Sequence, residues 1–192
     1  MTSPASPAPA KDREELILDA VLALLARHGI SGVSIRAVAR AAGVAPGLVG
    51  YYFQDKTSLI GAALRRIDEE VVALVTPDPG GTPEAQLRSV LRRVAAPRFL
   101  TTEYLSLRLQ LWSLAQAHED FAAINLDGQK RYRAGLARLI RAARPELSRA
   151  ECDRRAADID VVQNGLWLTA LLGLDKASLR RAVERCEEIA LS

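Results

Sequence analysis

Residues 34–56 of this chain read SIRAVARAAGVAPGLVGYYFQDK. This stretch predicts two short helices around a tight turn. Ser34 suits an N-cap because its hydroxyl can accept a hydrogen bond from a free first-turn N–H. Gly43 stands where the first helix should end, since glycine enters the left-handed cap conformation without penalty. Pro46 suits the first position of the second helix, where its missing N–H costs nothing.

The second helix of this pair has two unlike faces. Val49 and Phe53 point towards a core. Nothing obvious covers the opposite face, which holds Pro46, Gly47, Leu48, Gly50 and Tyr51. A short helix with small and aromatic residues on its free face suits insertion into the major groove of DNA. The alternative is an ordinary pair of buried helices.

The sequence around this turn resembles the helix-turn-helix of TetR-family transcriptional regulators. The match runs through AGVAPGLVGYYFQDKTSL, with six residues at positions typical of the family: Gly43, Val44, Gly47, Phe53, Lys56 and Leu59. The chain departs from the pattern at Gly50, where the family most often has tyrosine, and at Ala45, where serine or threonine is usual. A small residue at position 50 is typical of the BetI-like branch, whose members respond to choline-type ligands.

The composition is that of a globular protein with one sizeable core, or with a small head on a larger body. Of the 192 residues, 49% are hydrophobic and 26% are charged. The longest apolar runs, Ala20–Ala26 and Gly165–Leu174, are too short to span a bilayer, so we expect no membrane partner. Residues 1–10 form a Pro/Ala/Ser-rich tail that we expect to be disordered. Cys152 and Cys186 form no CxxC motif, which favours a reducing cytoplasm.

Positive charge gathers around the predicted turn. The net charge of the whole chain is only +3. Between Arg27 and Arg66, however, the basic residues face a single acid, Asp55, and acidic residues flank this band on both sides. A basic band bounded by acid matches the phosphate backbone of nucleic acid. The alternative is a solvated helix surface without a partner.

Hydrophobic residues keep a helical period along the rest of the chain, which predicts an all-α fold. Beyond the two helices of the turn, we expect helices over residues 12–28, 55–75, 84–96, 103–118, 120–144, 148–173 and 175–192, about nine in all. The stretch TPDPGGTP, residues 76–83, breaks the chain. We therefore expect a three-helix DNA-binding head in residues 11–75 and a larger helical bundle for ligand binding and dimerisation in residues 76–192.

Residues 103–118 leave two structures open. Leu105, Leu107, Leu109 and Leu111 alternate as in a strand, whereas Leu107, Leu111, Leu114 and His118 follow a helical stripe. We predict a helix, because no neighbouring segment offers a partner strand.

The last two helices are the expected dimer interface. Ser148 is a predicted N-cap, Glu151 would complete a capping box, and Asp175 caps the final helix. The second half of the first of these helices, IDVVQNGLWLTALLG, is apolar nearly all round. One side must face the core, and a second copy of the chain is the simplest cover for the other. We expect a homodimer through a four-helix contact.

The expected DNA contacts combine phosphate binding with modest base reading. The candidate residues are Ser34, Arg36, Ala45, Pro46, Gly47, Leu48, Gly50, Tyr51, Tyr52 and Lys56. Lys56, Arg36, the tyrosine hydroxyls and the helix-start N–H groups near Ser34 and Asp55 would hold phosphates. The reading face has no Arg, Asn or Gln, the usual bidentate readers of G and A. We expect a dimer on a near-palindromic operator, with reading helices roughly 34–36 Å apart.

The resemblance implies a small-molecule effector pocket within residues 76–192. The candidate lining residues are Tyr104, Arg108, Trp112, Gln163, Asn164 and Trp167. Aromatic rings with one or two amides suit an oriented ligand, and a quaternary ammonium could sit against tryptophan faces. The alternative is that Trp112 and Trp167 only pack the core.

Two other functions compete with that of a ligand-responsive repressor. An enzyme is disfavoured because His28 and His118 have no neighbouring cysteine or paired carboxylates, and no phosphate-binding glycine loop is present. We expect no cofactor and no metal site. The second rival binds DNA constitutively, without an effector, or activates transcription. We favour a ligand-released repressor.

Overall fold

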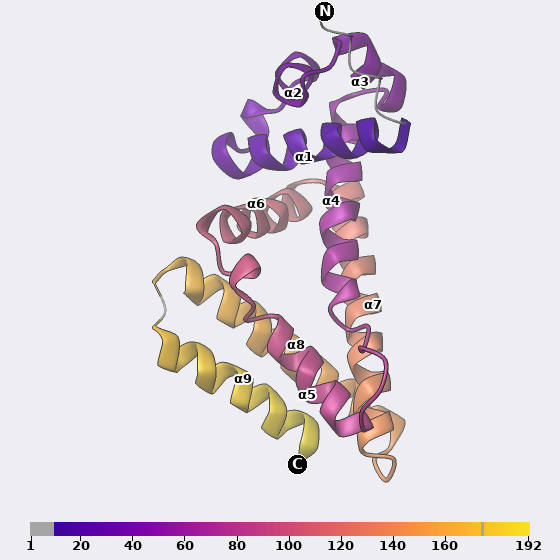
Figure 1. Cartoon of the computed structure of the whole chain (residues 1–192), viewed down its shortest axis with the longest axis vertical. Coiled ribbons are helices and arrows are strands. Elements are labelled where there is room, and N and C mark those ends of the chain that lie inside the picture. Colours follow the sequence, from indigo (N-terminus) through magenta and orange to yellow (C-terminus); the bar gives the residue numbers. More distant parts are fainter. Residues whose placement is uncertain (1–9, 174) are drawn as a thin grey trace, which may run out of the picture. The chain divides into compact units, whose positions relative to one another are not determined.

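The computed structural model describes residues 10–173 and 175–192, and all regular structure in these ranges is helical. The elements are α1 (Ala10–His28), η1 (Ile30–Gly32), α2 (Ile35–Ala42), α3 (Pro46–Tyr52), α4 (Lys56–Ala73), α5 (Pro83–Arg93), η2 (Pro97–Phe99), α6 (Thr102–Ala117), α7 (Glu119–Ala143), α8 (Arg149–Leu171) and α9 (Lys176–Leu191) (Figure 1). The predicted all-α fold is confirmed for the described residues. Apart from Ala10, the tail predicted over residues 1–10 lies outside them.

Helix α6 resolves the strand-like pattern of alternating leucines. Thr101 caps the helix, because its Oγ1 accepts a hydrogen bond from the Tyr104 N–H at 3.2 Å. Leu105 and Leu107 are both buried although they are two residues apart, whereas Leu109 is 45% exposed. Helices α7 and α8 both contact α6, which is why buried leucines alternate in its sequence in addition to the helical stripe.

The chain divides into two compact units, residues 1–64 and 65–192, with the division inside α4. In the first unit, α1 packs on α2 and η1, and α2 packs on α3. The core of this unit includes buried apolar side chains from α1, α2, α3 and α4, among them Ile17, Val21, Val38, Val49 and Leu59. These contacts hold the helix-turn-helix predicted around Gly43 in a fixed geometry.

In the second unit, α7 and α8 pack on each other and α9 lies along α8 (Figure 1). The core of the unit includes Leu87, Leu136, Ile140, Ile159 and Trp167. None of the described helices is long and apolar enough to cross a membrane.

Two glycines of α7 let α4 and the residues directly after it approach closely. A β-carbon built at Gly135 would overlap the Cγ2 methyl of Val75, and one at Gly128 would lie 2.8 Å from the Asp68 Cγ. The two positions are seven residues apart and therefore lie on the same face of α7. Larger side chains there would force α7 and this part of α4 apart.

The predicted N-caps of α8 and α9 are confirmed, but the capping box at α8 is not. Ser148 Oγ accepts from the Glu151 N–H at 3.1 Å, and Asp175 Oδ1 accepts from the Ser178 N–H at 2.8 Å. The Glu151 carboxylate turns away from Ser148 and accepts from Arg154 and Arg155, each at 2.7 Å. Charge-assisted bonds to two guanidinium groups are stronger than one to a backbone N–H.

Candidate nucleic-acid interface and effector cavity

Local hydrogen bonds set the turn between α2 and α3. Ser34 Oγ accepts from the Ala37 N–H at 3.1 Å, and so begins α2 as predicted. Gly43 ends the helix with φ of 67°, in the left-handed region. The N–H of Val44 then donates to the Ala39 carbonyl at 3.0 Å. Pro46 lies in the first turn of α3, and Ala45 at the N-cap supplies no side-chain hydrogen bond.

Helix α3 presents the small and aromatic face that its sequence predicts. Val49 and Phe53 are buried, whereas Tyr51 is 81% exposed. Gly47 and Gly50 are also exposed, and a β-carbon built at either would meet nothing within 4 Å. Ala45 and Pro46 are exposed too. The backbone of α3 is therefore open to close approach by a partner.

Two members of the candidate set are less open than the rest. Leu48 and Tyr52 are half-buried. The Tyr52 ring packs edge-on against Tyr51, with centroids 5.3 Å apart. This contact limits the directions in which the exposed Tyr51 ring can lie.

The groups predicted to contact phosphates differ in their exposure and in their internal hydrogen bonds. Arg36 is exposed on α2. Lys56 is also exposed, but its Nζ donates to the Ile30 carbonyl at 2.7 Å. The carboxylate of Asp55 accepts from the Ser58 N–H at 2.7 Å, and this bond lowers the pKa of Asp55. Because Ser34 and Asp55 satisfy the N–H groups of Ala37 and Ser58, those two groups do not serve a phosphate.

A small cavity lies among four helices of residues 65–192. Its volume is about 20 Å³, which is room for one water molecule. The lining side chains come from α4, α6, α7 and α8: Asp68, Val71, Arg108, Asn125, Gly128, Gln129, Tyr132, Asp160, Gln163, Asn164 and Trp167. Four of the six candidate ligand residues are in this set, namely Arg108, Gln163, Asn164 and Trp167.

The other two candidates, Tyr104 and Trp112, lie behind the cavity wall. Trp112 lies under Arg108, whose guanidinium carbon is 5.3 Å from the indole centroid. Tyr104 packs edge-on against Trp167 at 6.2 Å between centroids. Both aromatic rings therefore position lining side chains without lining the cavity.

A buried arginine and a buried aspartate dominate the charge of the cavity. The Arg108 side chain is sandwiched between rings, because its guanidinium also lies 5.0 Å from the Trp167 centroid. Its Nη1 is 4.0 Å from the Asp68 Oδ1. Burial raises the pKa of Asp68 to about 6, although Arg108 and Arg131 oppose the shift.

Most of the other polar side chains that line the cavity form hydrogen bonds with each other or with neighbouring side chains. Tyr132 donates its hydroxyl to Gln163 Oε1 at 2.6 Å, and burial raises the pKa of that phenol. Asp160 accepts from Arg133 Nε at 2.6 Å and from Asn164 Nδ2 at 3.0 Å. Two buried donors of the cavity lining find no acceptor among the described residues: Arg108 Nε and Gln163 Nε2. Unpaired buried donors are costly, so both favour a bound acceptor.

Sequence reasoning missed the two carboxylates of the cavity, Asp68 and Asp160. A signal was present for each. Asp68 falls on the buried stripe of α4 between Ile67 and Val71, and Asp160 opens an almost wholly apolar run. An acid within an apolar stripe indicates a buried charge that needs a partner.

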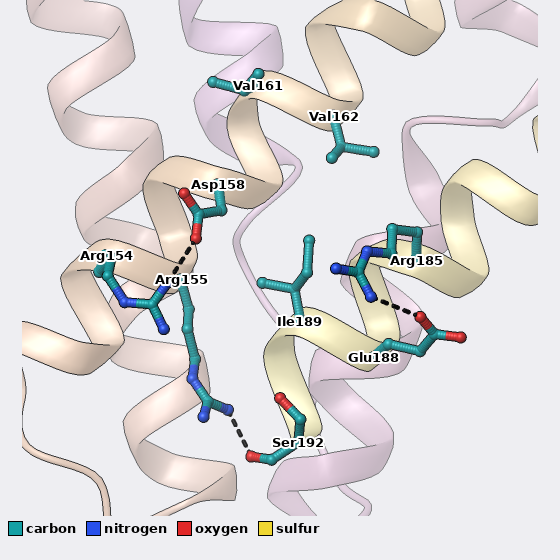
Figure 2. A pocket seen from close by; sticks show the side chains of 9 residues that line it. All are labelled: Arg154, Arg155, Asp158, Val161, Val162, Arg185, Glu188, Ile189 and Ser192. Atoms are coloured by element: carbon teal, nitrogen blue, oxygen red, sulfur yellow. Dashed lines mark hydrogen bonds and ion pairs between the residues drawn. The ribbon is translucent and has the colours of Figure 1, made fainter.

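Helices α8 and α9 expose apolar side chains beside a groove of about 450 Å³ (Figure 2). Val161, Val162 and Ile189 form its apolar part. Ion pairs flank them, Arg154 with Asp158 at 2.9 Å and Arg185 with Glu188 at 3.0 Å. Val161 is 67% exposed. This face combines an apolar centre with a charged rim.

Family models match both parts of the chain. Residues 17–63 match the bacterial regulatory proteins of the tetR family, and residues 83–191 match the C-terminal domain of the BetI-type transcriptional repressors. The HTH-type transcriptional regulator BetI of Paraburkholderia phymatum is 30% identical over 178 residues, which cover 88% of this chain and 89% of that protein. BetI of Escherichia coli K12 is 28% identical, over 85% and 86% of the two chains.

Solved structures share the fold. A transcriptional regulator from Pseudomonas aeruginosa PAO1 superposes with a TM-score of 0.82 at 24% identity, covering 95% of this chain and 90% of its own. A regulator from Saccharomonospora viridis, solved in complex with choline, has a TM-score of 0.70 at 20% identity and covers 93% and 95%.

Proposed function

This chain belongs to the TetR family of bacterial transcriptional regulators and carries a BetI-type repressor domain, and on that premise we propose that it represses transcription as a homodimer released by a small molecule. The family binds DNA operators as dimers and responds to small-molecule effectors. The observation that carries the proposal is the exposed face of α3, where open glycines and Tyr51 stand on a rigidly capped turn. We place its action in the bacterial cytoplasm and assign it no catalytic role.

Residues 11–75 are proposed to bind DNA through two kinds of contact, to phosphates and to base edges. Arg36 and Lys56 would bind phosphates, while Leu48 and Tyr51 contact base edges. The open backbone at Gly47 and Gly50 lets α3 lie deep in the major groove. With no bidentate reader on this face, affinity would depend on phosphates and on the second copy. Ser34, Ala45, Pro46 and Tyr52 complete the proposed interface.

The second copy is proposed to dock on α8 and α9. Exposed Val161, Leu168 and Leu172 would lose contact with water there, which is a favourable term of roughly 25 cal/mol for each Å² buried. The charged pairs that flank the groove in Figure 2 suit the rim of such an interface. A two-fold axis would then present two α3 helices to half-sites roughly 34–36 Å apart.

The cavity among α4, α6, α7 and α8 is proposed as the effector site. Most of its lining comes from residues 76–192, and Asp68 and Val71 of α4 complete the wall. A ligand releases DNA only if it prefers a conformation that binds DNA less well. Widening a cavity of about 20 Å³ would supply such a preference.

The small volume of this cavity favours a second candidate function, a constitutive DNA-binding factor with no effector. The buried donors of Arg108 and Gln163 argue against a constitutive factor, because they find no acceptor among the described residues and so favour a bound ligand. Release of bound duplex by a small molecule would exclude this candidate.

The test is selection of bound duplexes from a random library, followed by sequencing. We expect a near-palindrome with half-site centres about one helical turn apart, or a multiple of it. Recovery of asymmetric sites, or no enrichment, would overturn the proposed dimeric repressor.

A further inference from the structure

We propose that the cavity selects a small zwitterion, with the ligand carboxylate bound by Arg108 and Gln163 and the ligand ammonium bound by Asp68. This inference rests on the proposed function, because it takes the cavity to be the effector site. The cavity has room for one water molecule in this structure, so the ligand must widen it on binding. It specifies the chemical class of the ligand from side chains of this chain.

The carboxylate position follows from two orphan donors. Arg108 is 7% exposed and Gln163 is 2% exposed, and both line the cavity. In the part of the chain that the structure describes, Arg108 Nε and Gln163 Nε2 have no acceptor. The hydroxyl of Tyr132 holds Gln163 Oε1 at 2.6 Å, which leaves the amide nitrogen as the free donor. Two donors without an acceptor are best met by a carboxylate, whose two oxygens can accept from both.

The tryptophan faces argue against a lone quaternary ammonium. Such a cation binds over an indole ring. In this chain the guanidinium of Arg108 already lies over Trp112 and Trp167, at 5.3 and 5.0 Å. A ligand that brings only a positive charge would have to displace Arg108 or be repelled by it.

The ammonium position follows from the unequal pairing of the two acids. Asp160 already accepts from Arg133 and Asn164. Asp68 is buried, and within residues 10–173 and 175–192 its ion pair is with Arg108 Nη1, at 4.0 Å, beyond hydrogen-bond range. Asp68 is therefore the acid with capacity for an ammonium. Arg108 in the cavity lining balances the charge of Asp68, and Arg133, which lies outside the lining, balances that of Asp160. A ligand with one charge of each sign therefore leaves the net charge of this cluster unchanged.

The experiment uses the full-length protein and a matched series of probes in isothermal titration calorimetry. Each unbranched ω-amino acid of two to five carbons is compared with the plain carboxylate and the plain amine of equal length, and with choline. We expect the best ω-amino acid to bind at least about tenfold more tightly than its two relatives, a difference of about 1.4 kcal/mol. Tighter binding of choline or of a plain amine would overturn the proposal, as would no binding by any ω-amino acid, which would mean that the cavity holds water only.

Three variants separate the two ends of the ligand. Gln163→Glu keeps the side-chain shape but replaces the amide donor, so it should abolish binding of the zwitterion and of the plain carboxylate. Arg108→Met should do the same. Asp68→Asn should reduce the affinity for the zwitterion to that of the plain carboxylate. Asp153→Asn on the exposed face of α8 is the matched control and should bind like the parent. Equal binding by parent and Gln163→Glu would overturn the assignment even if Arg108→Met does not fold.

Release of DNA is measured separately with the same probes. Choline that binds and releases the duplex would overturn the zwitterion proposal and leave the proposed function intact. A zwitterion that binds without releasing DNA would support the ligand class but remove the effector role.

Discussion

Lys56 at the start of α4 donates a hydrogen bond of 2.7 Å to the carbonyl oxygen of Ile30, in the turn that follows α1. One ammonium therefore ties together two segments that are 26 residues apart in the sequence. The same group is a candidate phosphate contact, and an ammonium has three donors. Lys56 can hold the turn and bind a phosphate at the same time.

This double role predicts different outcomes for Lys56→Ala and Arg36→Ala. Each variant should weaken DNA binding at low salt and reduce the slope of log affinity against log salt by about 1. Only Lys56→Ala should also lower the free energy of unfolding, by roughly 0.5–1.5 kcal/mol, because it removes an internal hydrogen bond. Fluorescence anisotropy and urea unfolding measure the two effects.

Arg141→Ala, an exposed arginine of α7, is the control for these two variants and should change neither quantity. DNA binding by Arg36→Ala that matches the parent at every salt concentration would remove Arg36 from the interface.

Gly50→Ala should separate stability from DNA binding. A β-carbon at Gly50 meets nothing within 4 Å, so alanine should stabilise α3 by about 0.5–1 kcal/mol. The added methyl group would stand on the surface proposed to face the bases, so operator affinity should fall. Thermal unfolding and anisotropy are the measurements. A more stable variant with unchanged affinity and specificity would show that this face of α3 does not approach DNA.

Gly135→Ala should destabilise the second unit, because the new methyl group would overlap the Cγ2 of Val75. We expect a loss of about 1–3 kcal/mol from overpacking. Val75→Ala opens space at the same contact, so the double variant should lose less than the sum of the two single variants. A fully additive cycle in urea unfolding would contradict the close approach of α7 and α4.

The pKa of Asp68 predicts a pH dependence of stability. Burial raises this pKa from 3.8 to about 6. Between these values the folded protein binds more protons than the unfolded chain, so the contribution of Asp68 is most favourable below pH 4 and is lost as pH rises through about 6. Asp68→Asn does not titrate, and its stability relative to the parent should rise over this window by up to about 3 kcal/mol. A constant difference between parent and variant from pH 4 to 7 would contradict the shift.

Local signals in the sequence predicted the head of the protein well. Ser34, Gly43 and Pro46 act through hydrogen bonds and backbone angles within a few residues, and the structure places each as predicted. The cavity could be predicted only in part. Burial of Asp68 depends on the close approach of Gly128, sixty residues away in the sequence. The capping box at Ser148 failed for a similar reason, because Glu151 had stronger partners than the backbone.

Sedimentation velocity of the protein mixed with its selected duplex tests the central claim most directly. Binding as a homodimer predicts a complex of two chains on one duplex. It also predicts that Val161→Asp, which puts a charge on the exposed apolar face of α8, yields a folded monomer with far weaker DNA binding. Leu126→Asp, an equally drastic change at an exposed site of α7, should leave the complex intact. A parent protein that binds the duplex as a single chain with the same affinity would contradict the account.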